Sequence, residues 1–447
     1  MKGIKIIKLT LGLILLFSLY LFLGLICSYY NTVIYEHNDI IYDADIANYE
    51  YFAKECRVHF DRHPFAFILI PFLKVLVFFV GNPKLTLLIF QAGIAVFNNF
   101  LLFNVLRKIK VRLLTSVIFT LIYALSFSTL FYVSFTEIYL YSSCVGLLLT
   151  NCILSEKFFV THFSKNVHTA ITAFLCVCGL GINLINIVLY IPLLVYYFSN
   201  ITLSKERTRS IRIFAILFVF MISFFIILGE FVYGSSSSVF STNSLLWVEP
   251  DFSVYKAIRV LQETFMAPFY ALDTEFVLKG EYYGWYFKEV QHFLYFIPFL
   301  TLVIFSGFWK KQENIPVVIY YLIAVVALHL LLNCFYNKTW FLYSQNYLCF
   351  MVITFAYLYS KTSKNRQISV LSLFLLVQVV LNFKMLYHFA VWLNKSVSVL
   401  LPDVFTKLLA TDAVIVCLLG VGICIVKVFF VSKGYVCKAE DNKNENF

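Results

Sequence analysis

Apolar runs about 20 residues long recur along nearly the whole chain, which is the length needed to cross a bilayer as an α-helix. Such helices satisfy their own backbone hydrogen bonds, which lipid cannot do for them. Of the 447 residues, 61% are hydrophobic and only 13% are charged. These proportions lie outside the range of soluble domains, so we expect an all-α, polytopic integral membrane protein.

Twelve transmembrane helices are predicted, with no room for a soluble domain between them. The first apolar run follows a basic start, but it is longer than the apolar part of a signal peptide and lacks a clear cleavage site, so we expect a retained span. A single transmembrane domain is therefore predicted over residues 1–432, with a cytoplasmic tail at 433–447. The predicted spans are 8–29, 85–106, 113–134, 138–154, 168–183, 184–199, 213–232, 291–308, 316–335, 344–360, 367–390 and 412–432.

The segment 64–80, PFAFILIPFLKVLVFFV, decides the topology of everything after it. It is short, contains Pro64 and Pro71, and has Lys74 near its middle. If it stays outside as a juxtamembrane helix, every later basic cluster faces the cytoplasm together with the N-terminal lysines, as the positive-inside rule requires. If it crosses, the first of those clusters is outside while the N-terminus is inside, and every later cluster changes side as well. We therefore predict a juxtamembrane helix and two cytoplasmic termini.

The net charge of +11 follows the same pattern. Basic residues dominate the predicted cytoplasmic segments and acidic residues dominate the outer ones, so the charge reflects membrane topology rather than a nucleic-acid partner. The eleven cysteines include no C-x-x-C pair and lie mostly inside apolar runs, which is typical of small core residues.

Two outer loops, 30–63 and 233–290, are too long to be simple turns. Loops of this length in a compact membrane protein are usually functional or disordered, and the aromatic content of the second argues against disorder. We expect 233–290 to form short amphipathic helices on the membrane surface that cover a site on the outer face.

Charge concentrates in the first outer loop, YDADIANYEYFAKECRVHFDRHPF. Asp43 and Asp45 form a D-x-D pair, and Arg62 and His63 directly precede a proline that suits the first turn of a helix. With Lys74 about three turns further on, carboxylates and cations would meet at the headgroup level. This combination suits sugar transfer from a lipid phosphate: a carboxylate serves the acceptor hydroxyl, and cations stabilise the leaving phosphate. The alternative is a solvated charged loop.

Two further segments add candidate residues on the same face. In SFTEIYLYSS, Glu137 lies between apolar stretches, where an acid is costly unless it is partnered or faces water; the alternative is a boundary carboxylate in headgroup water. In NCFYNKTWFLYSQNY, Lys338 is a candidate phosphate ligand, and Tyr343 belongs to an aromatic group suited to a sugar or lipid. An ordinary interfacial aromatic belt is the alternative there.

Taken together, these residues resemble bacterial members of the GT-C glycosyltransferase superfamily, such as protein O-mannosyltransferases and lipid A aminoarabinose transferases. The elements that carry the resemblance follow in order over most of 1–360: Asp43 or Asp45, RHPFAFILIP, TEIYLYSS with Glu137, and WFLYSQNY. Here HPF replaces the usual His-Pro-Pro-Leu. The resemblance implies a GT-C-like helical fold in a bacterial inner membrane, with an outward-facing site.

The function implied is transfer of a sugar from a polyprenyl-phosphate donor to a lipid, glycan or protein acceptor. Asp43, Asp45 and Glu137 would be catalytic, while Arg62, His63, Lys74, Lys338 and Tyr343 would bind the substrate and its phosphate. Some members of the superfamily use a divalent metal, so Mg²⁺ or Mn²⁺ on Asp43 and Asp45 stays open. The alternatives are a polysaccharide polymerase or ligase, and a lipid or solute transporter or flippase built on discontinuous helices.

Overall fold

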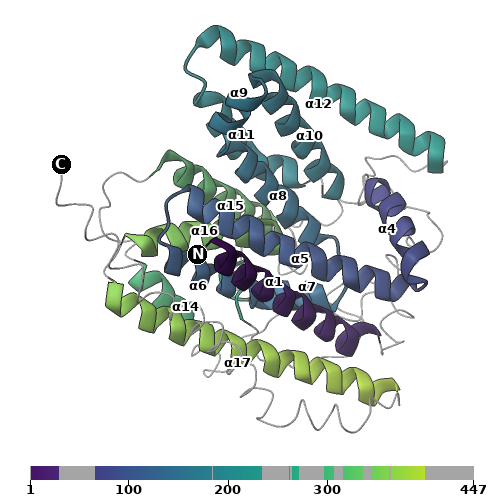
Figure 1. Ribbon diagram of the computed structural model, residues 1–447, viewed down its shortest axis with the longest axis vertical. Helices are drawn as coiled ribbons and strands as arrows, with labels where there is room; N and C mark the ends of the chain where they lie inside the picture. Colours follow the sequence, from purple (N-terminus) through teal and green to yellow (C-terminus); the bar gives the residue numbers. More distant parts are fainter. Residues whose placement is uncertain are drawn as a thin grey trace.

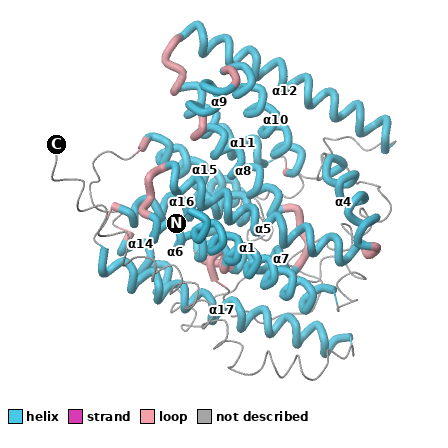
Figure 2. Tube along the Cα trace, in the orientation of Figure 1, coloured by secondary structure: helices cyan, strands magenta, loops and turns pink. Residues whose placement is uncertain are grey.

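The computed structural model describes residues 2–29, 66–183, 185–233, 261, 264–270, 296–306, 316–335, 344–361 and 364–397. Within these residues all regular structure is helical, as the apolar runs predict (Figures 1 and 2). The first half contains α1 (Lys2–Gly24), the π-helical turn η1 (Leu25–Tyr29), α4 (Ala66–Val80), α5 (Pro83–Lys108), α6 (Leu113–Ala124), α7 (Phe127–Ser134), α8 (Tyr139–Ile153), α9 (Glu156–His162), α10 (Lys165–Ile182) and α11 (Ile185–Ser199). The second half contains α12 (Ser204–Tyr233), α14 (Phe296–Phe305), α15 (Val317–Phe335), α16 (Gln345–Ser360) and α17 (Lys364–Val397).

Five of the described helices are long and apolar enough to cross a membrane, or up to seven segments if each bent pair counts as one span. Each predicted span from 8–29 to 367–390 overlaps a described helix, whereas 412–432 lies outside the described residues. The chain therefore has the character of a polytopic membrane protein, and the count of twelve stays a prediction.

The helices pack as one bundle around α5, which contacts α1, α6 and α8 (Figure 1). The long helices α12 and α17 run along opposite edges of the bundle in that view. The interior is formed by α7 and α16, whose apolar residues are almost completely buried. Helix α12, by contrast, packs mainly on α10 and leaves most of its span uncovered.

One predicted span is bent rather than straight. Residues 113–134 form α6 and α7, which meet at 48°. The predicted span 138–154 corresponds to α8, and α9 follows it at an angle of 65°. The prediction of one continuous helix over 113–134 is therefore wrong. Sequence periodicity does not reveal such a break, because both pieces are apolar and helical.

The segment predicted as a juxtamembrane helix forms α4. A left-handed turn at Gly81 (φ +74°) ends it, and Asn82 then caps α5 by accepting a hydrogen bond from the Leu85 N–H at 3.1 Å. Figure 1 shows α4 at the end of α5, turned away from the direction of that helix. Its depth in the membrane stays a prediction.

Candidate functional site

Most of the predicted site residues lie outside the described part of the chain. These are Asp43, Asp45, Arg62, His63, Lys338 and Tyr343. The structure places two others, Glu137 and Lys74.

Glu137 lies in the connection between α7 and α8, and it is buried with only 3% of its surface exposed. Its Oε2 atom accepts a hydrogen bond from the Ile138 N–H at 3.0 Å, and its backbone carbonyl accepts one from Gln91 Nε2 of α5 at 2.6 Å. The alternative of a carboxylate in headgroup water is therefore wrong. A buried carboxylate requires compensating donors, and the Ile138 N–H is one of them.

The start of the acidic first outer loop lies beside this connection. Ser28, in η1, donates a hydrogen bond from its hydroxyl to the carbonyl of Ser134, the last residue of α7. Tyr29, directly before the loop, accepts a hydrogen bond at its hydroxyl from Asn82 Nδ2 at 3.3 Å. Ser28, two residues before the segment 30–63, therefore contacts the end of α7 that leads to Glu137.

A second polar group is buried next to Glu137. The hydroxyl of Thr136 is 1% exposed and has no hydrogen-bond partner among the described residues. The side-chain amide of Asn346, in the first turn of α16, is likewise buried and unpartnered there. Buried polar groups are almost always satisfied, so each of these two groups is a candidate contact for water or a polar ligand, as are the other buried unpartnered groups of the described residues.

Lys74 has a different environment. It is exposed near the middle of α4, on a helix that also exposes Phe78 and Phe79. Lys74 and Glu137 therefore do not lie in one closed pocket.

The WFLYSQNY element contributes buried polar side chains that the sequence prediction missed. Gln345, at the start of α16, accepts hydrogen bonds at Oε1 from Tyr123 (3.2 Å) and Ser143 (2.9 Å), and its Nε2 donates to Thr129 (3.0 Å). Tyr347 donates from its hydroxyl to the Thr264 carbonyl at 2.9 Å. The element thus ties α16 to α6, α7 and α8, in addition to any role of its aromatic residues.

The break between α6 and α7 exposes carbonyls that a continuous helix would pair internally. Each receives a donor from a distant helix. The Ala124 carbonyl accepts from the Tyr20 hydroxyl, and the Ile122 and Leu125 carbonyls accept from Gln378 and Asn382 of α17, all at 2.8 Å. Backbone polar groups inside a membrane protein are thereby satisfied by side chains.

The N-terminal N–H groups of α7 are satisfied by a segment of the second outer loop. Phe127 and Ser128 donate their backbone N–H groups to the carbonyls of Phe269 and Pro268, each at 3.0 Å. Phe269 itself is completely buried. The prediction of surface helices over 233–290 is therefore wrong for residues 264–270. These residues lie inside the bundle, where two of their carbonyls accept hydrogen bonds from the first N–H groups of α7.

The sequence contained a signal for this site. Gln378 and Asn382 are four residues apart in an otherwise apolar run, so they share one helix face, and polar side chains in such a run usually face protein. The sequence contains no such signal for the carbonyls that accept these hydrogen bonds, because every residue has a backbone carbonyl.

Within the described residues no group of three His, Cys, Asp or Glu side chains could hold a metal ion. The carboxylates suggested for Mg²⁺ or Mn²⁺, Asp43 and Asp45, lie outside those residues. Comparisons of the chain with protein-family models, curated proteins and solved structures give no match.

Proposed function

We propose that the protein is a membrane glycosyltransferase that moves a sugar from a polyprenyl-phosphate donor to a lipid, glycan or protein acceptor at the outer face. The observation that carries this proposal is the buried carboxylate of Glu137, next to the orphan Thr136 hydroxyl and to the start of the acidic outer loop. An acid held out of water beside a loop with two further acids is a suitable arrangement for orienting hydroxyl groups of a sugar.

The proposed division of roles follows the charges. Asp43 or Asp45 accepts the proton of the acceptor hydroxyl, whose oxygen attacks the anomeric carbon of the donor sugar. The bond from that carbon to the phosphate oxygen breaks, and polyprenyl phosphate leaves with the electron pair. Arg62, His63, Lys74 and Lys338 would stabilise the negative charge on the phosphate, and Tyr343 would contact sugar or lipid. Glu137 would position the substrate from within the bundle.

The first prediction concerns the three acids. We expect Asp43→Asn, Asp45→Asn or the double variant to reduce glycan transfer at least 100-fold, about the contribution of a general base, and Glu137→Gln to reduce it about tenfold. Mass spectrometry of cell-surface glycans and glycolipids, in a strain lacking the gene and complemented with each variant, measures this. Glu156→Gln is the control, because Glu156 pairs with Lys165 at the opposite end of the bundle. Wild-type transfer by Asp43→Asn, Asp45→Asn and the double variant would contradict the proposal.

A transporter or lipid flippase is the second candidate, and the break between α6 and α7 favours it. Transporters commonly use discontinuous helices near the middle of the membrane, with unwound backbone lining the substrate site. Here the carbonyls and N–H groups at the break are already occupied by Gln378, Asn382 and the 264–270 segment, which fits a structural break better. Reconstitution in proteoliposomes separates the two: a transferase releases polyprenyl phosphate from the donor, whereas a flippase moves the intact lipid between leaflets.

A further inference from the structure

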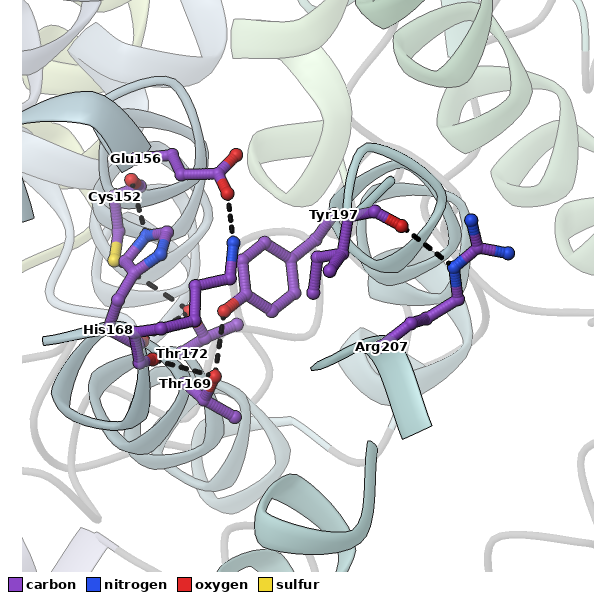
Figure 3. Close-up of polar contacts among 9 residues, drawn as sticks. Cys152, Glu156, His168, Thr169, Thr172, Tyr197 and Arg207 are labelled. Carbon is purple, nitrogen blue, oxygen red and sulfur yellow. Dashed lines mark hydrogen bonds and ion pairs between the residues drawn. The ribbon is translucent and has the colours of Figure 1, made fainter. Parts of the chain in front are cut away.

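The cytoplasmic end of the predicted topology contains a surface that the proposed sugar transfer does not use. It lies at the junction of α11 and α12, and its framework is fixed by hydrogen bonds and an ion pair (Figure 3). His168 Nε2 and the Cys152 carbonyl are 2.9 Å apart, and the Thr169 and Tyr197 hydroxyls are also 2.9 Å apart. Lys165 pairs with Glu156. These contacts join α8, α9, α10 and α11 into a rigid support for the start of α12.

Two grooves flank the first turns of α12. One, of about 660 Å³, lies on α12 itself and is lined by Ser204, Lys205, Thr208, Arg209, Arg212, Ile213 and Ile216. The other, of about 400 Å³, lies between α11 and α12 and is lined by Ile191, Leu194, Val195, Phe198, Ser199 and Arg207. The first groove has three cations toward the start of α12 and apolar side chains further along, whereas Arg207 is the one cation among the residues that line the second.

No partner for the cations of the α12 groove is found within the described part of the chain. The structure gives Lys205, Arg209 and Arg212 no ion pair within the described residues, and all three are exposed. Arg207 donates only from Nε, to the Ile201 carbonyl at 3.0 Å, and Figure 3 shows its other two nitrogens directed away from the labelled cluster. Glu206 lies between them in sequence but lines neither groove.

The same stripe of α12 continues into apolar surface. Lys205, Arg209 and Arg212 are spaced four and three residues apart, and Ile216 follows one turn later on that face. Further along the stripe, Val219 and Phe220 are 62% and 64% exposed. The opposite stripe, around Ser210 and Phe214, packs against the bundle. The outward face of α12 is basic in its first turns and apolar further along. The basic part is complementary to the anionic headgroup of a phospholipid, and the apolar part to its acyl chains.

We propose that the 660 Å³ groove at the start of α12 binds an anionic phospholipid of the leaflet at that end of the bundle. The phosphodiester contacts Lys205, Arg209 and Arg212, and the acyl chains lie along Ile216. Charge complementarity selects the headgroup, because the cations have no acid lining the grooves with them. The proposal is independent of the sugar-transfer reaction, since it concerns the opposite end of the bundle.

Native mass spectrometry of the full-length protein in a neutral detergent tests this proposal. The probes are phosphatidylglycerol, phosphatidylcholine and water-soluble glycerophosphoglycerol. We expect wild type to bind phosphatidylglycerol at least tenfold more tightly than phosphatidylcholine. Replacing three cations that each contribute about fivefold near an anionic headgroup, as in Lys205→Gln/Arg209→Gln/Arg212→Gln, should weaken phosphatidylglycerol binding on the order of 100-fold.

Two control variants separate a site from a general charge effect. Lys110→Gln/Lys157→Gln/Lys361→Gln removes the same charge from exposed positions at the same end of the bundle and should change binding less than threefold. Lys205→Arg/Arg209→Lys/Arg212→Lys keeps the charge and should restore binding to within threefold, which excludes misfolding as the cause. Equal losses in the two Gln variants, no preference for phosphatidylglycerol in wild type, or equally tight binding of glycerophosphoglycerol would each overturn the proposal.

Discussion

Gly179 of α10 leaves no room for a side chain. A Cβ atom added there would lie 2.3 Å from Cε2 of the Tyr190 ring in α11. The carbonyl of Gly179 also accepts a hydrogen bond from Asn186 Nδ2 at 2.9 Å, and Asn186 in turn accepts one from the Ser142 hydroxyl. The Gly-rich connection between α10 and α11 therefore serves close helix packing, as small residues in membrane helices often do.

We expect Gly179→Ala to destabilise the protein by about 1–3 kcal/mol, the range for overpacking a filled core. Thermal unfolding in detergent measures the effect. Gly93→Ala is the matched control, because no atom lies within 4 Å of its added Cβ. Tyr190→Leu should recover part of the loss in the double variant. Equal melting temperatures for the Gly179 and Gly93 variants would contradict this packing role.

Single residues also show what sequence reasoning can and cannot predict. The acid at Glu137 was identified from its apolar neighbours. Its burial was not predicted, because burial depends on tertiary packing, including the contact with Gln91 of α5. The same limit applies to Thr136 and Asn346. Their types are ordinary, and their burial without a partner among the described residues appears only in the structure.

The structural elements were predictable where a local signal exists. A long apolar run predicts a helix regardless of its partners, so the positions of the helices between residues 8 and 390 follow from the sequence. The break at Leu125 and Ser126 does not follow. It exists because Gln378, Asn382 and the carbonyl of Phe269 stabilise it, and these are contacts over more than 100 residues.

The side-chain amides of Gln378 and Asn382 in α17 can be tested by substitution. Gln378→Leu or Asn382→Leu leaves buried carbonyls without donors, and we expect each to lower stability by about 1–2 kcal/mol. The measurement is again thermal unfolding in detergent. Ser372→Leu on the same helix is the control, since Ser372 is exposed and a leucine there faces the hydrophobic surroundings. A loss in the control as large as in the amide variants would show that the amides have no special role.

For the whole molecule, the arrangement of charge is the basis of the predicted topology. Exposed basic residues lie near the ends of α5, α9, α12 and α16 that the predicted topology makes cytoplasmic, and Glu137 lies at the other end. This arrangement agrees with the positive-inside rule if α4 does not cross the membrane.

Labelling of single cysteines with an impermeant maleimide tests the topology, in a chain whose native cysteines are replaced. In intact cells we expect Ser236→Cys, in the second outer loop, to react and Lys110→Cys, after α5, to be protected. Both should react once the membrane is permeabilised. If α4 crosses the bilayer, the two positions exchange behaviour, so either result is decisive.

The Phe269 carbonyl accepts hydrogen bonds from Phe127, Gln378 and Asn382, which are made at very different times during translation. Translation reaches the break between α6 and α7 some 250 residues before it reaches the amides of α17 that complete it. At typical elongation rates of 5–20 residues per second, the gap is roughly 12–50 s. During that interval the nascent chain lacks the side-chain donors that stabilise the break in the finished bundle. Chains truncated before Gln378 should therefore be recognised by quality-control proteases, whereas chains truncated after Val397 should persist.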